Sequence, residues 1–387
     1  MIECKLSEIA DVIDCEHKTA PLVLDGDYYS IRTTDILNGK LDYNNANRVN
    51  AETYKNWTRR AIPEPNDIIL AREAPVGEVG IIKEGYQVCL GQRTVLIKVT
   101  DPKVFSKYLL YYFVYPETKY DLQVRSTGSV VAHLNMSDIR DFPILLPPLA
   151  EQKAIASVLS SLDDKIDNLH RQNKTLEAMA ETLFRQWFIE EADDSWEEVE
   201  LQDIADLNPS YSLSKGQIAP YLEMSNVNES TFNPKGWYER EFKSGMKFTN
   251  GDALIARITP CLENGKTCFV TFLNNNQIGW GSTEYIVLQM KEPFHPFIAY
   301  LIARNKEFRD YAISCMTGSS GRQRVQATQL ADFIVNYPDT ASINEMNKQC
   351  ESILGKLNYN ASQIQTLEKL RDTLLPKLMS GEVRVMQ

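Results

Sequence analysis

The sequence predicts an α+β protein made of two mostly β domains, each followed by a long helix and related to the other by an internal repeat. Three observations support this fold class. Residues 149–190 contain neither Gly nor Pro, and their apolar residues recur every three and four positions. The first part of each half consists of short β-branched and aromatic runs between Gly, Pro and Asn turns. Short motifs of the first half return in order in the second half.

Residues 149–190 carry the heptad pattern of a coiled-coil helix. Two tracks of core residues, three positions apart, repeat every seven residues over four heptads. They are Leu159, Ile166, Asn173, Ala180 and Trp187, and Leu162, Leu169, Leu176 and Leu183. At 1.5 Å per residue, about forty residues would form a helix roughly 60 Å long. A compact core needs no helix of that length, so we interpret the segment as a spacer.

The repeat covers the whole chain. LSEIAD at 6–11 returns as LQDIAD at 201–206, and matched motifs at 67–72, 127–129 and 141–142 return at 252–257, 317–319 and 332–333. In each half we expect a short helix, at about 104–112 and 296–304, and then a strand that ends in Pro, at 139–148 and 330–338. We therefore predict two domains, 1–148 and 191–338, followed by spacer helices at 149–190 and 339–387.

The second helix has the same core tracks, displaced by 191 residues. They are Cys350, Leu357, Ile364, Arg371 and Leu378, and Ile353, Asn360, Leu367 and Leu374. Asn173 lies at an a position and Asn360 at a d position, and in an antiparallel pair a packs against d. The two amides could then face each other and fix the register of the helices; alternatively, both lie at exposed or frayed places.

Composition is that of an ordinary globular protein, with 43% hydrophobic and 24% charged residues. No apolar run is long enough to span a membrane, and the N-terminus lacks the layout of a signal peptide. Seven cysteines without a CxxC pair fit a reducing cytoplasm, and four widely separated histidines argue against zinc. The net charge of −11 means that any contact with nucleic acid needs local basic patches or a more basic partner.

Two junction motifs carry a family resemblance. LPPLAEQ at 146–152, with Ile155 and Leu159, opens the first long helix, and LPKLMSGEV at 375–383 ends the second. With the two divergent domains, these motifs make the whole chain strongly resemble the DNA-specificity subunit of type I restriction–modification systems. The second junction, Tyr337-Pro338-Asp339-Thr340, lacks the PPLxEQ form, so the second domain could dock on its helix differently.

The resemblance implies a fold and a set of partners. It implies two target-recognition domains separated by two long antiparallel coiled-coil helices in a pseudo-two-fold arrangement. The expected partners are double-stranded DNA, two methyltransferase subunits and restriction/translocase subunits, with no membrane. The chain itself would bind no cofactor, since S-adenosylmethionine would be held by the methyltransferase subunits. Two unlike domains suit an asymmetric bipartite target.

Candidate DNA contacts are Arg, Gln, Ser and Thr side chains in loops, which can read base edges or bind phosphates. In the first domain they are Arg32, Thr33, Thr34, Arg72, Gln92, Arg93, Arg125, Thr127, Gly128 and Ser129. In the second they are Arg257, Ser282, Thr283, Gly318, Ser319, Arg322, Gln323 and Arg324. Arg72 and Arg257 match across the repeat, so they could instead form a shared structural ion pair; the Gly-Ser pairs could be plain turns.

Catalytic motifs are incomplete. Asn208-Pro209-Ser210-Tyr211 lacks the second Pro of the Asn-Pro-Pro-Tyr motif of amino-methyltransferases, and Asn264-Gly265-Lys266-Thr267 follows Pro260 where a P-loop requires Gly. We therefore expect no catalytic residue and no metal site. The alternatives are a two-ended protein–protein scaffold and a methyltransferase or nuclease whose motifs have drifted.

Overall fold

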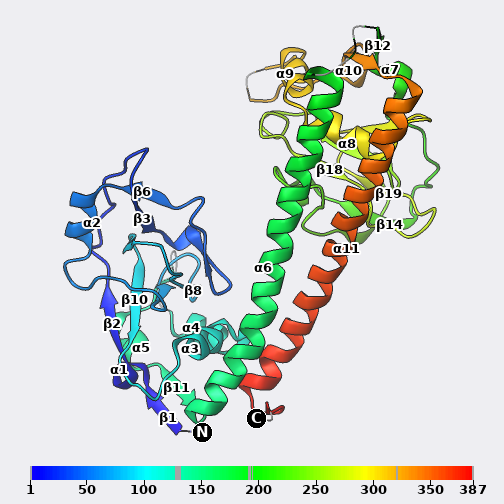
Figure 1. The fold of residues 1–387 in the computed structure, drawn as a ribbon. Coiled ribbons are helices and arrows are strands. Elements are labelled where there is room, and N and C mark those ends of the chain that lie inside the picture. Colours follow the sequence, from blue (N-terminus) through cyan, green and yellow to red (C-terminus); the bar gives the residue numbers. More distant parts are fainter. Residues whose placement is uncertain (1, 127–131, 191–192, 194, 320, 386–387) are drawn as a thin grey trace. The chain divides into compact units, whose positions relative to one another are not determined.

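The computed structural model describes residues 2–126, 132–190, 193, 195–319 and 321–385 (Figure 1). The chain forms two compact units. Unit 1 is Met1–Lys165 with Leu367–Gln387, and unit 2 is Ile166–Thr366. Helices α6 (Leu149–Arg185) and α11 (Thr340–Met379) each contribute to both units. Among the described residues, no helix combines the length and apolarity needed to cross a membrane.

Unit 1 contains an antiparallel sheet of four strands, in the order β2-β10-β7-β8, and a second sheet of three strands, β6-β3-β9. Its strands are β1 (Ile2–Lys5), β2 (Ala10–Asp14), β3 (Tyr28–Ile31), β4 (Ile36–Leu37), β5 (Lys40–Leu41), β6 (Asn47–Val49), β7 (Ile68–Ala71), β8 (Val79–Ile81), β9 (Val88–Leu90), β10 (Thr94–Val99) and β11 (Pro143–Leu146). Its short helices are α1 (Leu6–Ile9), η1 (Thr33–Asp35), α2 (Ala51–Trp57), α3 (Ser106–Val114), α4 (Pro116–Arg125) and α5 (Met136–Arg140).

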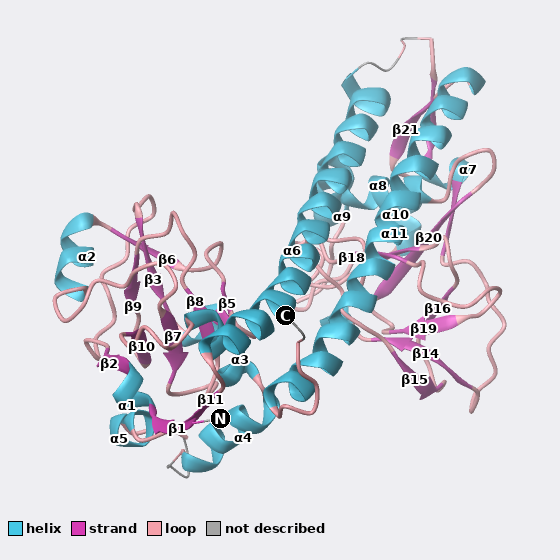
Figure 2. Cartoon of the chain, turned by 60° about the horizontal axis from the view of Figure 1, so that its bottom comes forward, coloured by secondary structure: helices cyan, strands magenta, loops and turns pink. Residues whose placement is uncertain are grey.

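Unit 2 has the matching four-stranded sheet β13-β20-β17-β18. Its second sheet, β15-β14-β19-β16, contains β16 in addition to the three strands that match unit 1 (Figure 2). Its strands are β12 (Glu197–Glu200), β13 (Ala205–Leu207), β14 (Ile218–Leu222), β15 (Tyr238–Glu241), β16 (Met246–Phe248), β17 (Ala253–Ala256), β18 (Thr267–Phe269), β19 (Gly279–Gly281), β20 (Tyr285–Met290) and β21 (Ile334–Tyr337). Its helices are η2 (Gln186–Glu190, a π-helix), α7 (Leu201–Ile204), η3 (Met224–Asn226), α8 (Phe297–Arg304), α9 (Lys306–Ser314) and α10 (Ala327–Ala331).

The shared topology confirms the predicted fold class, with one local correction. The strand expected at 139–148 is shorter, because α5 precedes it and β11 covers only Pro143–Leu146. Asn135 precedes α5, and its Nδ2 donates to the carboxylate of Asp138, the third residue of the helix, at 2.9 Å. The second copy has the same arrangement, since α10 precedes β21.

One buried glutamine attaches the first module to α6. Gln152, which belongs to the LPPLAEQ motif, is 1% exposed. Its Oε1 accepts from the Phe105 N–H at 2.9 Å, and its Nε2 donates to the carbonyls of Lys103 and Pro147 at 3.0 and 2.9 Å. All the hydrogen-bonding capacity of the amide except one lone pair is therefore used, which explains why this residue type stands in the motif.

The second module uses a different residue for the same contact. The position that matches Gln152 holds Ile343, which is buried. One helical turn later, Asn347 accepts from the His295 N–H at 2.8 Å and donates to the Pro293 carbonyl at 2.7 Å. The second junction therefore docks through an amide as well, although it lacks the PPLxEQ form.

The long helices run antiparallel within each unit (Figure 1). In unit 1 the guanidinium of Arg371 lies 3.1 Å from Asp163 Oδ1, whose Oδ2 accepts from the Tyr111 hydroxyl at 2.6 Å. In the same unit Arg384, which follows α11, lies 3.9 Å from Glu151 near the start of α6. Since higher numbers on one chain segment meet lower numbers on the other, the two segments have opposite directions.

Unit 2 contains the two seam asparagines. Asn360 is fully buried and Asn173 is nearly so, and Asn360 Nδ2 donates to Asn173 Oδ1 at 2.8 Å. The two residues are thus in direct contact, as the a-against-d argument proposed. Asn360 Oδ1 has no partner among the described residues, so this one hydrogen bond has to offset most of the cost of burying two amides.

Unit 2 also has a polar contact between α6 and α8. The Tyr300 hydroxyl donates to Glu177 Oε2 at 2.8 Å, and Arg304 Nε donates to Glu181 Oε1 at 2.9 Å. Glu177 is 4% exposed, and this burial raises the pKa of its carboxyl group to about 7. The corresponding positions of unit 1 are Leu110, Val114, Glu368 and Asp372, so the contact belongs to one half of the repeat.

The asparagine pair gives a prediction on stability. Asn360→Leu leaves the Asn173 amide buried without its partner and should lower the free energy of unfolding by about 1–3 kcal/mol. The double variant Asn173→Leu/Asn360→Leu removes both amides and should regain at least that amount. Urea unfolding of the wild type, both single variants and the double variant measures the coupling. Losses that simply add in the double variant would contradict the pairing as the cause.

Candidate nucleic-acid interface

The site residues of the first module surround the end of β7. Arg72 follows this strand; its N–H donates to the Arg93 carbonyl at 3.0 Å, and its carbonyl accepts from the Leu134 N–H at 2.9 Å. These bonds bring together three segments that are distant in sequence. Of the other candidates in this module, Thr33 and Thr34 belong to η1 (Thr33–Asp35), and Arg32 directly precedes it.

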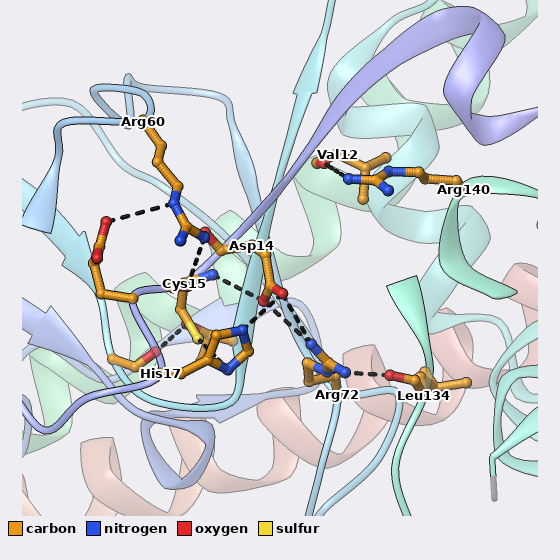
Figure 3. A network of polar contacts seen from close by, with 11 residues as sticks. Val12, Asp14, Cys15, His17, Arg60, Arg72, Leu134 and Arg140 are labelled. Atoms are coloured by element: carbon orange, nitrogen blue, oxygen red, sulfur yellow. Dashed lines mark hydrogen bonds and ion pairs between the residues drawn. The ribbon is translucent and has the colours of Figure 1, made fainter. Parts of the chain in front are cut away.

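Arg72 is held by a partly buried ion pair (Figure 3). Its Nη1 lies 3.1 and 3.2 Å from the carboxylate oxygens of Asp14, and its Nε donates to the Leu134 carbonyl at 3.1 Å. The Arg72 and Asp14 side chains are 13% and 18% exposed. His17 Nε2 lies 2.9 Å from the same carboxylate. The sequence left open whether Arg72 contacts DNA or forms a structural ion pair, and the structure contains the ion pair.

Arg93 and Gln92 are exposed at the turn after β9. Arg93 Nε lies 2.9 Å from Glu73 Oε2, and half of the Arg93 side chain remains exposed. Gln92 makes one weak contact, in which its Oε1 accepts from the Thr19 hydroxyl at 3.5 Å. Both side chains can therefore reach a ligand, but Arg93 carries a compensated charge.

The segment around Arg32 is more strongly tied to the protein. Arg32 donates to both carboxylate oxygens of Asp35, at 2.9 and 2.7 Å, and to the Asn45 carbonyl at 2.9 Å. Thr33 is buried and its hydroxyl donates to the Ala74 carbonyl at 3.2 Å, which leaves it no surface for DNA. Thr34 is the exposed member of the three.

The remaining candidates of the first module are at the end of α4. Arg125 is exposed, and its guanidinium carbon lies 5.1 Å from the centre of the Phe142 ring. A cation–π contact at an exposed site is weak enough to be exchanged for a phosphate. Thr127, Gly128 and Ser129 lie outside the described residues.

The second module has the same corner after β17. The Arg257 N–H donates to the Glu284 carbonyl at 2.9 Å, and the Arg257 carbonyl accepts from the Val325 N–H at 3.1 Å. Glu284 and Val325 therefore match Arg93 and Leu134. The side chain of Arg257 is held differently: its Nη2 donates to Gln326 Oε1 at 2.6 Å, and its buried Nε has no partner among the described residues.

Arg324 is bound by a carboxylate. Its Nε and Nη2 lie 2.8–3.0 Å from the oxygens of Glu284, and its backbone pairs with Thr317 across a short hairpin. The guanidinium of Arg324, one of the predicted DNA contacts, is thus charge-compensated.

The other candidates of the second module lie in the same hairpin or beside it. Gly318, Ser319, Arg322 and Thr283 are exposed, and Gln323 and Ser282 are half-buried. The Gln323 carbonyl accepts from the Thr259 N–H at 3.1 Å, and Ser282 Oγ accepts from the Glu284 N–H at 3.1 Å. Arg322 forms no ion pair with any described residue, so it is the most accessible uncompensated cation of the hairpin.

One mixed group of side chains was missed by the sequence reasoning on metals, which considered only the spacing between histidines. Asp14, Cys15 and His17 place possible ligand atoms within 4.8 Å of one another. The Asp14 carboxylate already binds the Arg72 guanidinium, and Arg60 donates to the Cys15 carbonyl at 2.9 Å (Figure 3). The positive charges of Arg60 and Arg72 would repel a metal ion bound to this group. The Asp14 carboxylate is instead the ion-pair partner of Arg72.

The asparagine of the Asn-Pro-Ser-Tyr motif has a structural role. Asn208 has a φ of 54°, and its N–H and Oδ1 bond the Val287 carbonyl and N–H at 2.7 and 2.9 Å. Asn is among the residues that adopt this left-handed conformation most readily. The motif thus ends β13, and its amide is used within the fold.

The ion pair of the first module gives a second prediction. Arg72→Gln leaves the Asp14 carboxylate partly buried without its guanidinium partner and should lower the free energy of unfolding by about 1–3 kcal/mol. Arg322→Gln is the matched control, because an exposed cation without a partner should change this quantity by less than about 0.5 kcal/mol. Denaturant titration compares them. Equal effects of the two substitutions would show that the Arg72 pair is not structural.

Comparison with known proteins agrees with this architecture. The family model described as "Type I restriction modification DNA specificity domain" matches residues 1–178. The specificity subunit of the type I restriction enzyme MjaIX of Methanocaldococcus jannaschii is 24% identical, over 93% of this chain and 88% of the relative. The EcoAI specificity subunit of Escherichia coli is 36% identical over 146 residues, which are 35% of this chain and 24% of the relative.

A solved structure shares the fold. The crystal structure of the type I restriction-modification system S subunit from M. genitalium aligns with a TM-score of 0.60 and 15% identity, covering 97% of this chain and 95% of that chain. The family match therefore covers the first module and most of α6, while the similarity to the MjaIX specificity subunit and the fold of the M. genitalium S subunit extend over nearly the whole chain.

Proposed function

We propose that the chain is the DNA-recognition subunit of a type I restriction–modification complex and that its two modules read the unlike halves of an asymmetric bipartite sequence. The observation that supports this most strongly is that the two modules share one topology but carry different side chains at matching positions. The same corner of the two modules carries Gln92 and Arg93 in one copy and Thr283 and Glu284 in the other. Since base edges are read by individual side chains, the two corners should select different bases.

The long helices would set the number of unread bases between the half-sites. α6 has 37 residues, so it is about 55 Å long. Its packing against α11, present in each unit, would support its role as a spacer. The buried Asn173–Asn360 contact would admit only one register of the pair, which would keep that distance constant.

Catalysis would belong to the partners. We infer that two methyltransferase subunits dock on the helices, that they hold S-adenosylmethionine, and that restriction/translocase subunits join for cleavage. A net charge of −11 weakens attraction to DNA, so basic partner subunits would supply part of the affinity. In this scheme the chain contributes sequence choice and contains no catalytic group.

Mapping the methylated adenines tests the proposed function. In DNA modified by the chain assembled with its methyltransferase subunits, we expect two short, different half-sites separated by a fixed number of unread bases. A continuous motif would overturn the bipartite reading. No sequence preference in the assembled complex would favour a protein–protein scaffold, and methylation by the isolated chain would show that it is an enzyme.

The spacer role gives a separate prediction. Removing one heptad from both α6 and α11 shortens the pair by about 10 Å, which equals about three base pairs of DNA. The methylation map should then show the same half-sites with about three fewer unread bases. Replacing the same heptads by others of equal length is the control and should leave the spacing unchanged. An unchanged spacing in the deletion variant would show that helix length does not set it.

A further inference from the structure

The two matched arginines have different electrostatic surroundings. In the first module Arg72 and Asp14 form one ion pair, and Arg93 and Glu73 form another, so the charges of this corner cancel. In the second module Arg324 and Glu284 form one ion pair. Arg257 has no carboxylate within ion-pair distance among the residues that the structure describes, which leaves one positive charge uncompensated.

The missing carboxylate follows from the length of one strand. β2 continues to Asp14, which pairs with Val95 on β10. The matching strand β13 ends at Leu207, opposite Leu288 on β20. Asn208 then turns the chain with its positive φ. β13 therefore ends two residues before the position at which β2 presents the acid, and no residue replaces it.

The surroundings of Arg257 suit an anionic ligand. Within the part of the chain that the structure describes, its only side-chain hydrogen bond is to the neutral amide of Gln326, and its buried Nε has no partner there. Keeping a guanidinium half-buried without a carboxylate is costly unless a ligand supplies the negative charge. The neighbouring hairpin adds Arg322, which is exposed and also forms no ion pair with a described residue.

We propose that Arg257 binds a backbone phosphate of the DNA at the half-site of the second module, whereas its counterpart Arg72 is a structural residue that contacts no DNA. The inference rests on the proposed function and deepens it, because it assigns the role of phosphate contact to only one of two equivalent positions. A phosphate is the expected ligand, since one guanidinium neutralises one phosphate charge regardless of base sequence.

The sharpest test leaves Arg257 in place and neutralises it. Gln326 Oε1 lies 2.6 Å from Arg257 Nη2, so Gln326→Glu supplies the missing carboxylate with little change in shape. Arg257→Gln removes the charge directly, and Arg257→Lys keeps it. Thr328→Glu, on an exposed position of α10, adds the same negative charge without a contact to Arg257.

The readout is the salt dependence of binding to the duplex target, measured with the chain assembled with its methyltransferase subunits between about 50 and 200 mM salt. Losing one phosphate contact lowers the slope of log affinity against log salt by about 0.9. We expect this decrease for Gln326→Glu and Arg257→Gln, and the wild-type slope for Arg257→Lys, Thr328→Glu and Arg72→Gln.

The outcomes separate the two proposals. An unchanged slope for both Gln326→Glu and Arg257→Gln would overturn the inference, and so would an equal decrease for Arg72→Gln or Thr328→Glu. A decrease confined to one target sequence would show that Arg257 reads a base and would also overturn it. A wild-type complex without sequence preference would overturn the proposed function itself.

Discussion

Neither long helix can bury its apolar stripe alone, and this constraint determines the rest of the structure. A helix of 37 or 40 residues exposes its core track to water unless another helix covers it. Within each unit, one side of each long helix packs against the other long helix. The remaining side is covered by the first module with its helix α3 in unit 1, and by the second module with its helix α8 in unit 2. The core clusters show this directly, since each contains residues of one module and of both long helices.

Apolar packing of this kind is nearly symmetric between the units, whereas the polar contacts within it are not. In unit 1 Tyr111, Asp163 and Arg371 form one set. In unit 2 the corresponding role is divided between the asparagine pair and the contact of Glu177 with Tyr300. Buried polar groups tolerate few alternative partners. These contacts therefore distinguish the two halves of the chain, whereas apolar packing alone would let either module pack on either end of the helix pair.

The sequence allowed the long helices and the internal repeat to be predicted, because both are periodic. It did not allow the surroundings of individual arginines to be predicted, because these depend on where one strand ends. Heptads and ordered repeats predicted the fold class, and the spacing of Asn173 and Asn360 brought them opposite each other. The different surroundings of Arg72 and Arg257 depend on where β13 stops, which is decided by one turn at Asn208. The capture of Arg324 by Glu284, 40 residues earlier, is a tertiary contact that no local pattern contains. Short helices such as α5 were missed for a different reason, because a helix of five residues is too short to show periodicity.

The two docking amides lie inside the helices and outside the β modules. Gln152 is in the first turn of α6, and Asn347 is in the second turn of α11. A chimaeric chain joined at the visible border between module and helix would therefore pair each module with a foreign anchor. Because the anchors occupy different turns, the part of each helix inherited with a module would have to differ between the two halves. The unit that can be exchanged between related chains is thus larger than the domain seen in the ribbon.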